Sequence, residues 1–147
     1  QRRFVPLNVT AVEFPYRSIA DGDPARPLHQ VILTNTTNGH QIGCWALVDS
    51  GADENLFPAD IGRVLGHDLR KGVRRTTAGV GGRTASFVHR ENRIRIHERL
   101  PDLEVDVSFS ETLNRFGFGL LGQRGFFDRF RVVFDYRNRL FSLDPAR

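Results

Sequence analysis

The residues with the clearest chemical potential are Asp49, Ser50 and Gly51, which directly follow an apolar run over residues 42–48. An apolar run without alternation is typical of a β-strand that is buried on both faces. A carboxylate at the end of such a strand is costly to bury unless its neighbours hydrogen-bond it or it takes part in acid–base chemistry. Ser50 supplies a hydroxyl group, and Gly51 lets the backbone turn sharply. The structural alternative is an Asx-turn in which Asp49 caps its own loop.

Two motifs resemble the signatures of the retropepsin-like aspartic proteases. Residues 46–52 are similar to their active-site pattern, in which apolar residues precede Asp-Thr/Ser-Gly-Ala, and residues 118–122 are similar to their second signature, two apolar residues followed by glycine. The two motifs stand in the expected order with a glycine-rich stretch between them. The resemblance extends over residues 28–143, and it implies an all-β domain that hydrolyses peptide bonds.

The same resemblance assigns roles to individual residues. Asp49 would be the catalytic carboxylate, Ser50 would hydrogen-bond across a dimer, and Gly51 would offer its carbonyl group to the substrate backbone. Asp53 would bind substrate and form an ion pair with an arginine near the second signature, but Arg124 stands one position later than in retroviral members, which leaves that pair open. The residues assigned to substrate binding are Ala52, Asp53, Gly79, Val80, Gly81, Gly82 and Leu121.

Peptide hydrolysis by carboxylates requires a pair of them, one as general base and one as general acid. Two carboxylates in contact share a proton and can divide these roles. The chain has a single Asp-Ser-Gly, and Asp21-Gly22-Asp23 lies in a polar turn cluster without a preceding apolar strand. We therefore expect a twofold homodimer that places two copies of Asp49 face to face, with terminal segments such as residues 140–143 at the interface.

Short β-strands would position these residues. We expect strands at residues 9–17, 29–35, 41–48, 73–77, 83–88, 90–96, 103–109, 131–136 and 140–143. Short helices are expected at 58–65, with Ile61, Val64 and Leu65 on one apolar face, and at 123–130, with Phe126, Phe127 and Phe130 on one face. The pattern predicts an all-β, closed barrel-like domain with one or two short helices.

Two glycine-containing turns connect strands in this scheme. Asn38-Gly39 is a hairpin signal, and the returning strand delivers Asp49 to its loop. Residues 78–82 contain three glycines and predict a mobile hairpin tip, which resembles the flap that closes over a bound peptide. An ordinary turn is the alternative; a phosphate-binding loop is not supported, because the helix and lysine that it needs do not follow.

Length and composition indicate one domain over residues 1–147, with residues 1–28 as an N-terminal extension or extra strand. The chain opens on Gln1 and contains no Met, so we expect a processed product or an excised domain, and localisation is not indicated.

The net charge of +4 raises nucleic-acid binding as an alternative, but the arginines are spread along the chain and mostly suit solvated strand faces. We predict no metal, cofactor, nucleic acid or membrane insertion, and a buried, unpaired Cys44. A catalytically inactive binding or dimerisation module remains the other alternative.

Overall fold

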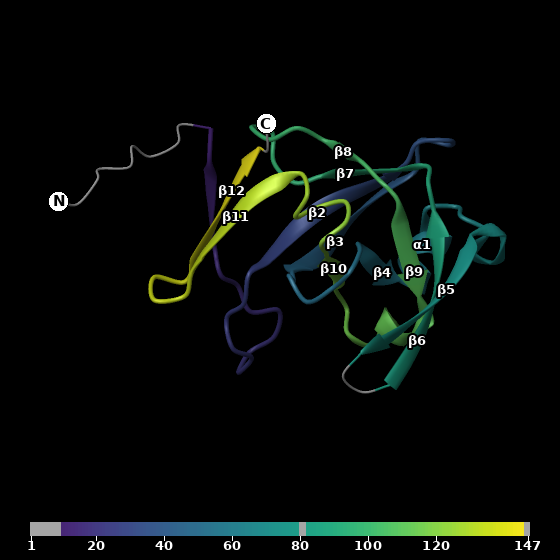
Figure 1. Cartoon of the computed structure of the whole chain (residues 1–147), viewed down its shortest axis with the longest axis horizontal. Helices are drawn as coiled ribbons and strands as arrows, with labels where there is room; N and C mark the ends of the chain where they lie inside the picture. Colours follow the sequence, from purple (N-terminus) through teal and green to yellow (C-terminus); the bar gives the residue numbers. More distant parts are fainter. Residues whose placement is uncertain (1–9, 80–81, 146–147) are drawn as a thin grey trace.

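Two β-sheets form the framework of the computed structural model, which describes residues 10–79 and 82–145 (Figure 1). Within these residues the larger sheet has nine strands in the order β5-β6-β9-β4-β10-β3-β2-β7-β8, and the smaller has three in the order β1-β12-β11. The strands are β1 (Val12–Pro15), β2 (Leu28–Asn35), β3 (Gln41–Val48), β4 (Leu56–Pro58), β5 (Val73–Gly79), β6 (Gly82–His89), β7 (Asn92–Arg95), β8 (Leu103–Glu104), β9 (Val107–Ser110), β10 (Gly119–Leu121), β11 (Phe130–Asp135) and β12 (Leu140–Pro145). The helical elements are α1 (Ala59–Val64) and two 3₁₀ helices, η1 (Leu69–Lys71) and η2 (Glu111–Arg115).

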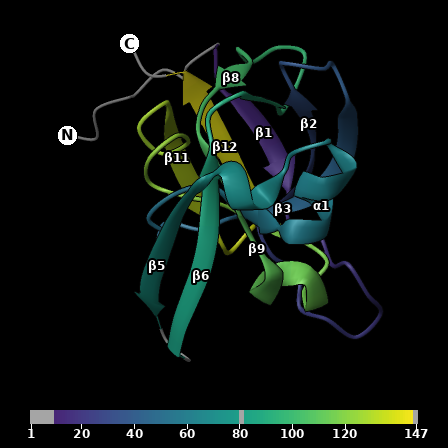
Figure 2. The same ribbon diagram turned by 90° about the vertical axis from the view of Figure 1, so that its right-hand side faces the viewer.

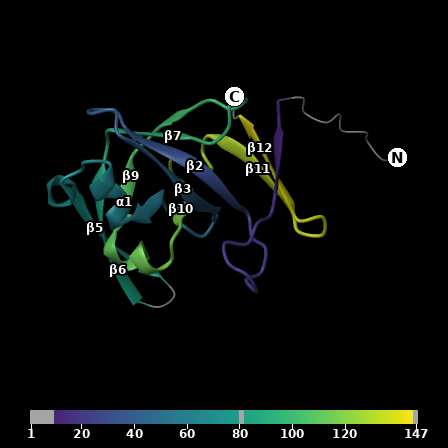
Figure 3. The ribbon, with the colours of Figure 1, turned by 180° about the vertical axis from the view of Figure 1, so that it is seen from behind.

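This architecture confirms the all-β prediction with one short α-helix. The larger sheet curls into a half-barrel, which Figure 3 shows from behind. Its two outer strands are β5 and β8, so the sheet is open where the sequence had suggested a closed barrel. Among the described residues, no helix is long and apolar enough to cross a membrane.

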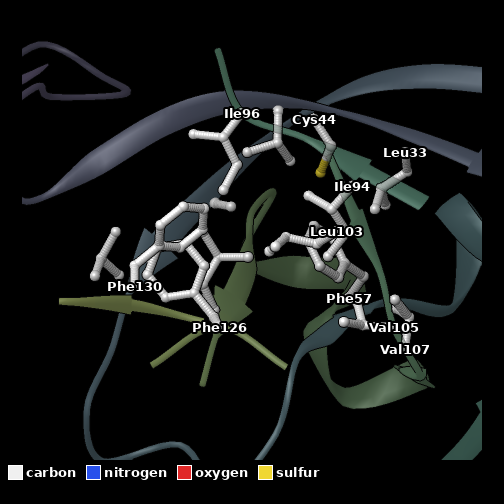
Figure 4. Close-up of a cluster of buried hydrophobic side chains, with 14 of the residues drawn as sticks. Leu33, Cys44, Phe57, Ile94, Ile96, Leu103, Val105, Val107, Phe126 and Phe130 are labelled. Atoms are coloured by element: carbon white, nitrogen blue, oxygen red, sulfur yellow. The ribbon is translucent and has the colours of Figure 1, made fainter. Parts of the chain in front are cut away.

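The hydrophobic core draws side chains from both sheets (Figure 4). On β3, Cys44, Ala46 and Val48 are buried, whereas the alternate residues Trp45 and Leu47 are only partly buried. The prediction that both faces of this strand are buried is therefore wrong for the single chain. Its apolar character suits an interior place in the sheet between β2 and β10. Cys44 is free and buried as predicted, and burial raises the pKa of its thiol to about 11.

One of the three residues predicted for the apolar face of helix α1 is exposed instead. Leu65 is buried and Ile61 packs against the core, but Val64 is 58% exposed. The helix approaches Phe109 through Gly62, where an added Cβ would lie 2.9 Å from the Phe109 ring. The close approach through this small residue sets the rotation of the helix and turns Val64 outward.

Two further expectations are corrected. Residues 123–130 form consecutive turns instead of a helix. Some of their backbone hydrogen bonds span five residues, such as the one from the Phe127 N–H to the Gly122 carbonyl (3.1 Å). Gly125, at φ +94°, interrupts a helical path, although Phe126 and Phe130 are buried as expected. The strand expected over 103–109 is two strands, because β8 pairs with β7 whereas β9 pairs with β4 and β6.

The terminal sheet also differs from expectation. The first strand, expected over 9–17, is β1, and Val9 lies outside the described residues. β12 pairs with β1 on one side and β11 on the other. Since both of its edges are used within the chain, the prediction that residues 140–143 pair across a dimer is wrong.

Candidate active site

Asp49 begins the loop that connects β3 to β4, at the end of the sheet where β3 and β10 run parallel. The Asp49 N–H donates to the Leu121 carbonyl (3.0 Å), and the Ala52 N–H donates to the Asp49 carbonyl (3.1 Å). The Gly51 N–H donates to the Asp49 carboxylate oxygen Oδ1 (2.9 Å). The half-buried carboxylate therefore caps its own turn with Oδ1. Oδ2 has no hydrogen-bond partner in the part of the chain that is described.

The segment after β10 runs beside this loop and bonds to it residue by residue. Gln123 N–H donates to the Ala52 carbonyl (2.9 Å), and Arg124 N–H donates to the Asp53 carbonyl (3.0 Å). The Gln123 side-chain amide donates to the Ser50 carbonyl (2.8 Å). The two sequence motifs are thus assembled into one backbone unit.

Asn55 joins the same unit from the core, and its role was not predicted from the sequence. Its side chain is fully buried, and Oδ1 accepts a hydrogen bond from the Gly122 N–H (3.0 Å). Its Nδ2 has no protein partner among the described residues. The one available signal was an amide placed directly before the apolar Leu56 and Phe57, where a polar side chain needs a specific partner.

Glu54 connects the loop to two arginines. Its carboxylate lies 2.9 Å from Arg75 Nη1 on β5 and 3.7 Å from Arg124 Nη2, and its side chain is only 14% exposed. Arg124 thus contacts Asp53 through its backbone and Glu54 through its guanidinium. The ion pair that the sequence left open for Asp53 is formed by Glu54 instead.

The hairpin of β5 and β6 projects from the rest of the larger sheet (Figure 2). Gly79 pairs with Gly82, which has φ +117°, whereas Val80 and Gly81 lie outside the described residues. Apart from its pairing with β5, β6 pairs among the described strands only with β9, over residues 87–89 at its base. The predicted hairpin is therefore present and projects from the sheet.

The other residues assigned to substrate binding occupy different environments. Ser50, Gly51 and Asp53 are exposed and Ala52 is half-buried, so all four lie at or near the surface of the loop. Leu121 is only 1% exposed and packs in the core, so its side chain does not reach that surface. Its part in the site is the carbonyl group that accepts from Asp49. Among the described residues, no group of three or more His, Cys, Asp or Glu could hold a metal ion.

A family model described as aspartyl protease matches residues 33–124, which include the Asp49 loop and the segment after β10. The chain belongs to this aspartyl protease family. A crystal structure of a retropepsin-like aspartic protease from Rickettsia conorii superposes with a TM-score of 0.61, covering 92% of this chain and 100% of that chain at 19% sequence identity. At this identity the likeness establishes the fold, which is retropepsin-like. No curated protein sequence matches the chain.

Proposed function

We propose that the chain is an aspartic endopeptidase whose active site contains Asp49 from each of two copies. The observation that carries this proposal is the environment of Asp49. The Gly51 N–H and the Leu121 carbonyl fix the residue in place, and the Oδ2 oxygen lacks a partner among the described residues. A fixed carboxylate with one oxygen available can accept a proton from water. Family membership and the retropepsin-like fold support a peptidase acting on protein or peptide substrates.

The second carboxylate is proposed to come from a homodimer. One Asp49 would act as general base on the attacking water, while the protonated partner would donate to the carbonyl oxygen of the scissile bond. Ser50 is proposed to hydrogen-bond between the two loops, and Gly51 to offer its carbonyl group to the substrate backbone. Ala52, Asp53 and the hairpin tip, including Gly79, Val80, Gly81 and Gly82, would then contact the peptide.

The test of Asp49 is its replacement by asparagine, which keeps the size of the side chain and removes the carboxylate. Peptide-library digestion, read by mass spectrometry at pH 4 to 8, should show cleavage by the wild type that falls about 10³-fold or more in Asp49→Asn. Asp68→Asn, the same change at an exposed carboxylate before η1, is the matched control and should retain activity. Undiminished cleavage by Asp49→Asn would exclude Asp49 as the catalytic residue.

The shared site is tested by mixing subunits. After subunit exchange, an equal amount of Asp49→Asn protein should draw about half of the wild-type subunits into inactive mixed dimers. Activity that stays unchanged on mixing, in a preparation that sediments as a monomer, would contradict the homodimer. A chain that binds a peptidomimetic aspartic-protease inhibitor but cleaves no peptide would instead be the inactive binding module.

A further inference from the structure

The peptide unit that joins Ser50 to Gly51 is hydrogen-bonded at both of its polar groups. Its N–H belongs to Gly51 and donates to Asp49 Oδ1 (2.9 Å). Its carbonyl group belongs to Ser50 and accepts from the side-chain nitrogen Nε2 of Gln123 (2.8 Å). Because a peptide unit is planar, its N–H and its carbonyl group turn together. The orientation of the Asp49 carboxylate is therefore coupled to the side chain of Gln123, which lies 73 residues beyond Ser50 in the chain.

The backbone of Gln123 is fixed on both sides, so that its side chain is presented to the Asp49 loop. The Gln123 N–H donates to the Ala52 carbonyl (2.9 Å), and the Gln123 carbonyl accepts from the Asp128 N–H (3.1 Å). Gln123 is exposed, and water competes for the hydrogen bond of its side chain. A fixed backbone lowers the cost of that bond, because only the side-chain torsions remain to be ordered.

The chain of hydrogen bonds from Gln123 to Asp49 has one direction. A carbonyl oxygen can only accept, so the amide nitrogen of Gln123 must face Ser50. A donor at the carbonyl end polarises the peptide unit, and the N–H at its other end becomes a stronger donor. The Gln123 amide thereby strengthens the bond from Gly51 to Oδ1. That bond orients the carboxylate and leaves Oδ2 as the oxygen without a partner among the described residues.

A second side-chain amide makes the same kind of bond away from the site and provides a comparison. Asn38 Nδ2 donates to the Leu65 carbonyl (3.0 Å). The peptide unit of Leu65 continues through the Gly66 N–H to the Arg63 carbonyl (2.9 Å), which is a backbone group. The bond of Asn38 can only stabilise a turn, whereas the chain that starts at Gln123 ends on a carboxylate.

We propose that Gln123 is a positioning residue of the active site, whose side chain fixes the Ser50–Gly51 peptide unit and, through it, the carboxylate of Asp49. The inference rests on the proposed peptidase function. It adds to the site an exposed side chain that neither sequence motif had singled out.

The first test removes the donor with Gln123→Leu. At pH 5, kcat should fall about tenfold while KM stays within about twofold, because the carboxylate loses its alignment and the peptide contacts remain. The exchange of the Gly51 amide hydrogen, followed by NMR, should accelerate several-fold. Asn38→Leu removes the comparison bond and should leave both kcat and Gly51 exchange at the wild-type values.

The second test is Gln123→Glu, which makes the bond depend on pH. A protonated carboxyl group can donate its O–H to the Ser50 carbonyl, whereas the ionised form repels that oxygen. Because an ordinary glutamate has a pKa of about 4.3, kcat relative to wild type should be highest near pH 4 and about tenfold lower at pH 6.5. Gln41→Glu places the same group at an exposed position at the start of β3 and should keep the wild-type pH profile.

The outcomes separate this proposal from the peptidase. If Gln123→Leu and Gln123→Glu cleave peptide like their controls at every pH, the positioning role is wrong and the peptidase stands. A loss of kcat in Gln123→Glu that is equal at pH 4 and pH 6.5 would also overturn the positioning role, since a side chain that only supports the fold gives no recovery on protonation. If the wild type cleaves no peptide while Gln123→Leu still accelerates Gly51 exchange, the peptidase is refuted and Gln123 is only structural.

Discussion

At the scale of single residues, the geometry of Asp49 is compatible with both interpretations that its sequence context left open. Oδ1 accepts the Gly51 N–H in the Asx-turn, while Oδ2 has no partner among the described residues. The turn fixes the orientation of the carboxylate before any substrate binds, and such preorganisation is what a catalytic group requires. The structural and catalytic interpretations of Asp49 are therefore compatible.

Gly122 is the residue on which the position of this loop depends most directly. A Cβ added there would lie 2.4 Å from the Glu54 carbonyl oxygen and 2.8 Å from the Ala52 carbonyl oxygen, both of them backbone atoms. We expect Gly122→Ala to lower the free energy of unfolding by about 1–3 kcal/mol and to abolish most peptide cleavage, because the loop must shift. Denaturant unfolding and kcat/KM are the measurements.

Gly43→Ala is the matched control for this prediction. Gly43 lies on β3, where an added Cβ meets no atom within 4 Å, so the change should alter stability by no more than about 0.5 kcal/mol. Equal stability and activity of Gly122→Ala and Gly43→Ala would show that the loop does not depend on the close approach at Gly122.

The sequence predicted the residues of this site only where a short local motif identifies them. The roles of Asp49, Gly51 and Gly122 could be inferred from the motifs, because each depends on a local turn or a close backbone approach. The roles of Glu54 and Asn55 could not, because they arise from contacts with Arg75 and Gly122, which are distant in the chain. An amide or carboxylate next to a signature does not by itself reveal its partner.

At the scale of elements, local signals predicted the two hairpins and helix α1 close to their observed bounds. Elements whose form depends on distant contacts were missed. The run 103–109 alternates like one strand, but different partners divide it into β8 and β9. Residues 123–130 have a helical spacing of phenylalanines, yet their backbone bonds to the Asp49 loop and the conformation of Gly125 prevent a helix.

The contact of Arg75 with Glu54 links the projecting hairpin to the loop that begins at Asp49. β5 pairs only with β6 among the described strands, so this ion pair of 2.9 Å is a second attachment of that edge strand. We expect Arg75→Gln to accelerate amide hydrogen exchange in residues 73–76 and 83–86 several-fold, and to raise KM more than it lowers kcat, because a looser hairpin binds peptide less well. Mass-spectrometric exchange and steady-state kinetics would measure both effects.

The neighbouring Arg74 provides the comparison, since successive strand residues point to opposite faces. Arg74→Gln makes the same chemical change on the same strand and should leave both exchange and KM close to wild type. If the two variants exchange at the same rate, the ion pair with Glu54 does not restrain the hairpin.

At the scale of the whole molecule, the pairing of β12 with β1 could not be foreseen, because it joins the two ends of the described chain, whereas β11 and β12 are consecutive strands. Local strand patterns do not determine which strands become neighbours. The consequence is functional: a dimer of this chain must use a surface other than the edges of β12.

Two histidines, the buried His89 and the half-buried His29, make the stability of the whole fold sensitive to pH. Burial is the main cause that lowers the pKa of His89 and that of His29 below the ordinary value of 6.5. For His89, the nearby His67 lowers the pKa further, whereas the Leu69 carbonyl, Glu91 and Asp68 oppose the shift. The folded state therefore favours neutral imidazoles, and the unfolded chain takes up these protons first as the pH falls.

The resulting prediction is that stability is greatest above pH 6.5 and declines as the pH falls toward 5, because the unfolded chain takes up protons on these histidines before the folded state does. The thermal midpoint should drop by a few degrees between pH 7.5 and 5.0, at about 2–4 °C for each kcal/mol. His89→Gln, which keeps an amide donor near the Leu69 carbonyl, should show a smaller drop, whereas His40→Gln removes an exposed histidine as the control. Identical pH dependence in wild type and His89→Gln would show that His89 does not couple protonation to folding. A smaller drop in His89→Gln would mean that the neutral, buried imidazole of His89 contributes to the loss of stability at acidic pH.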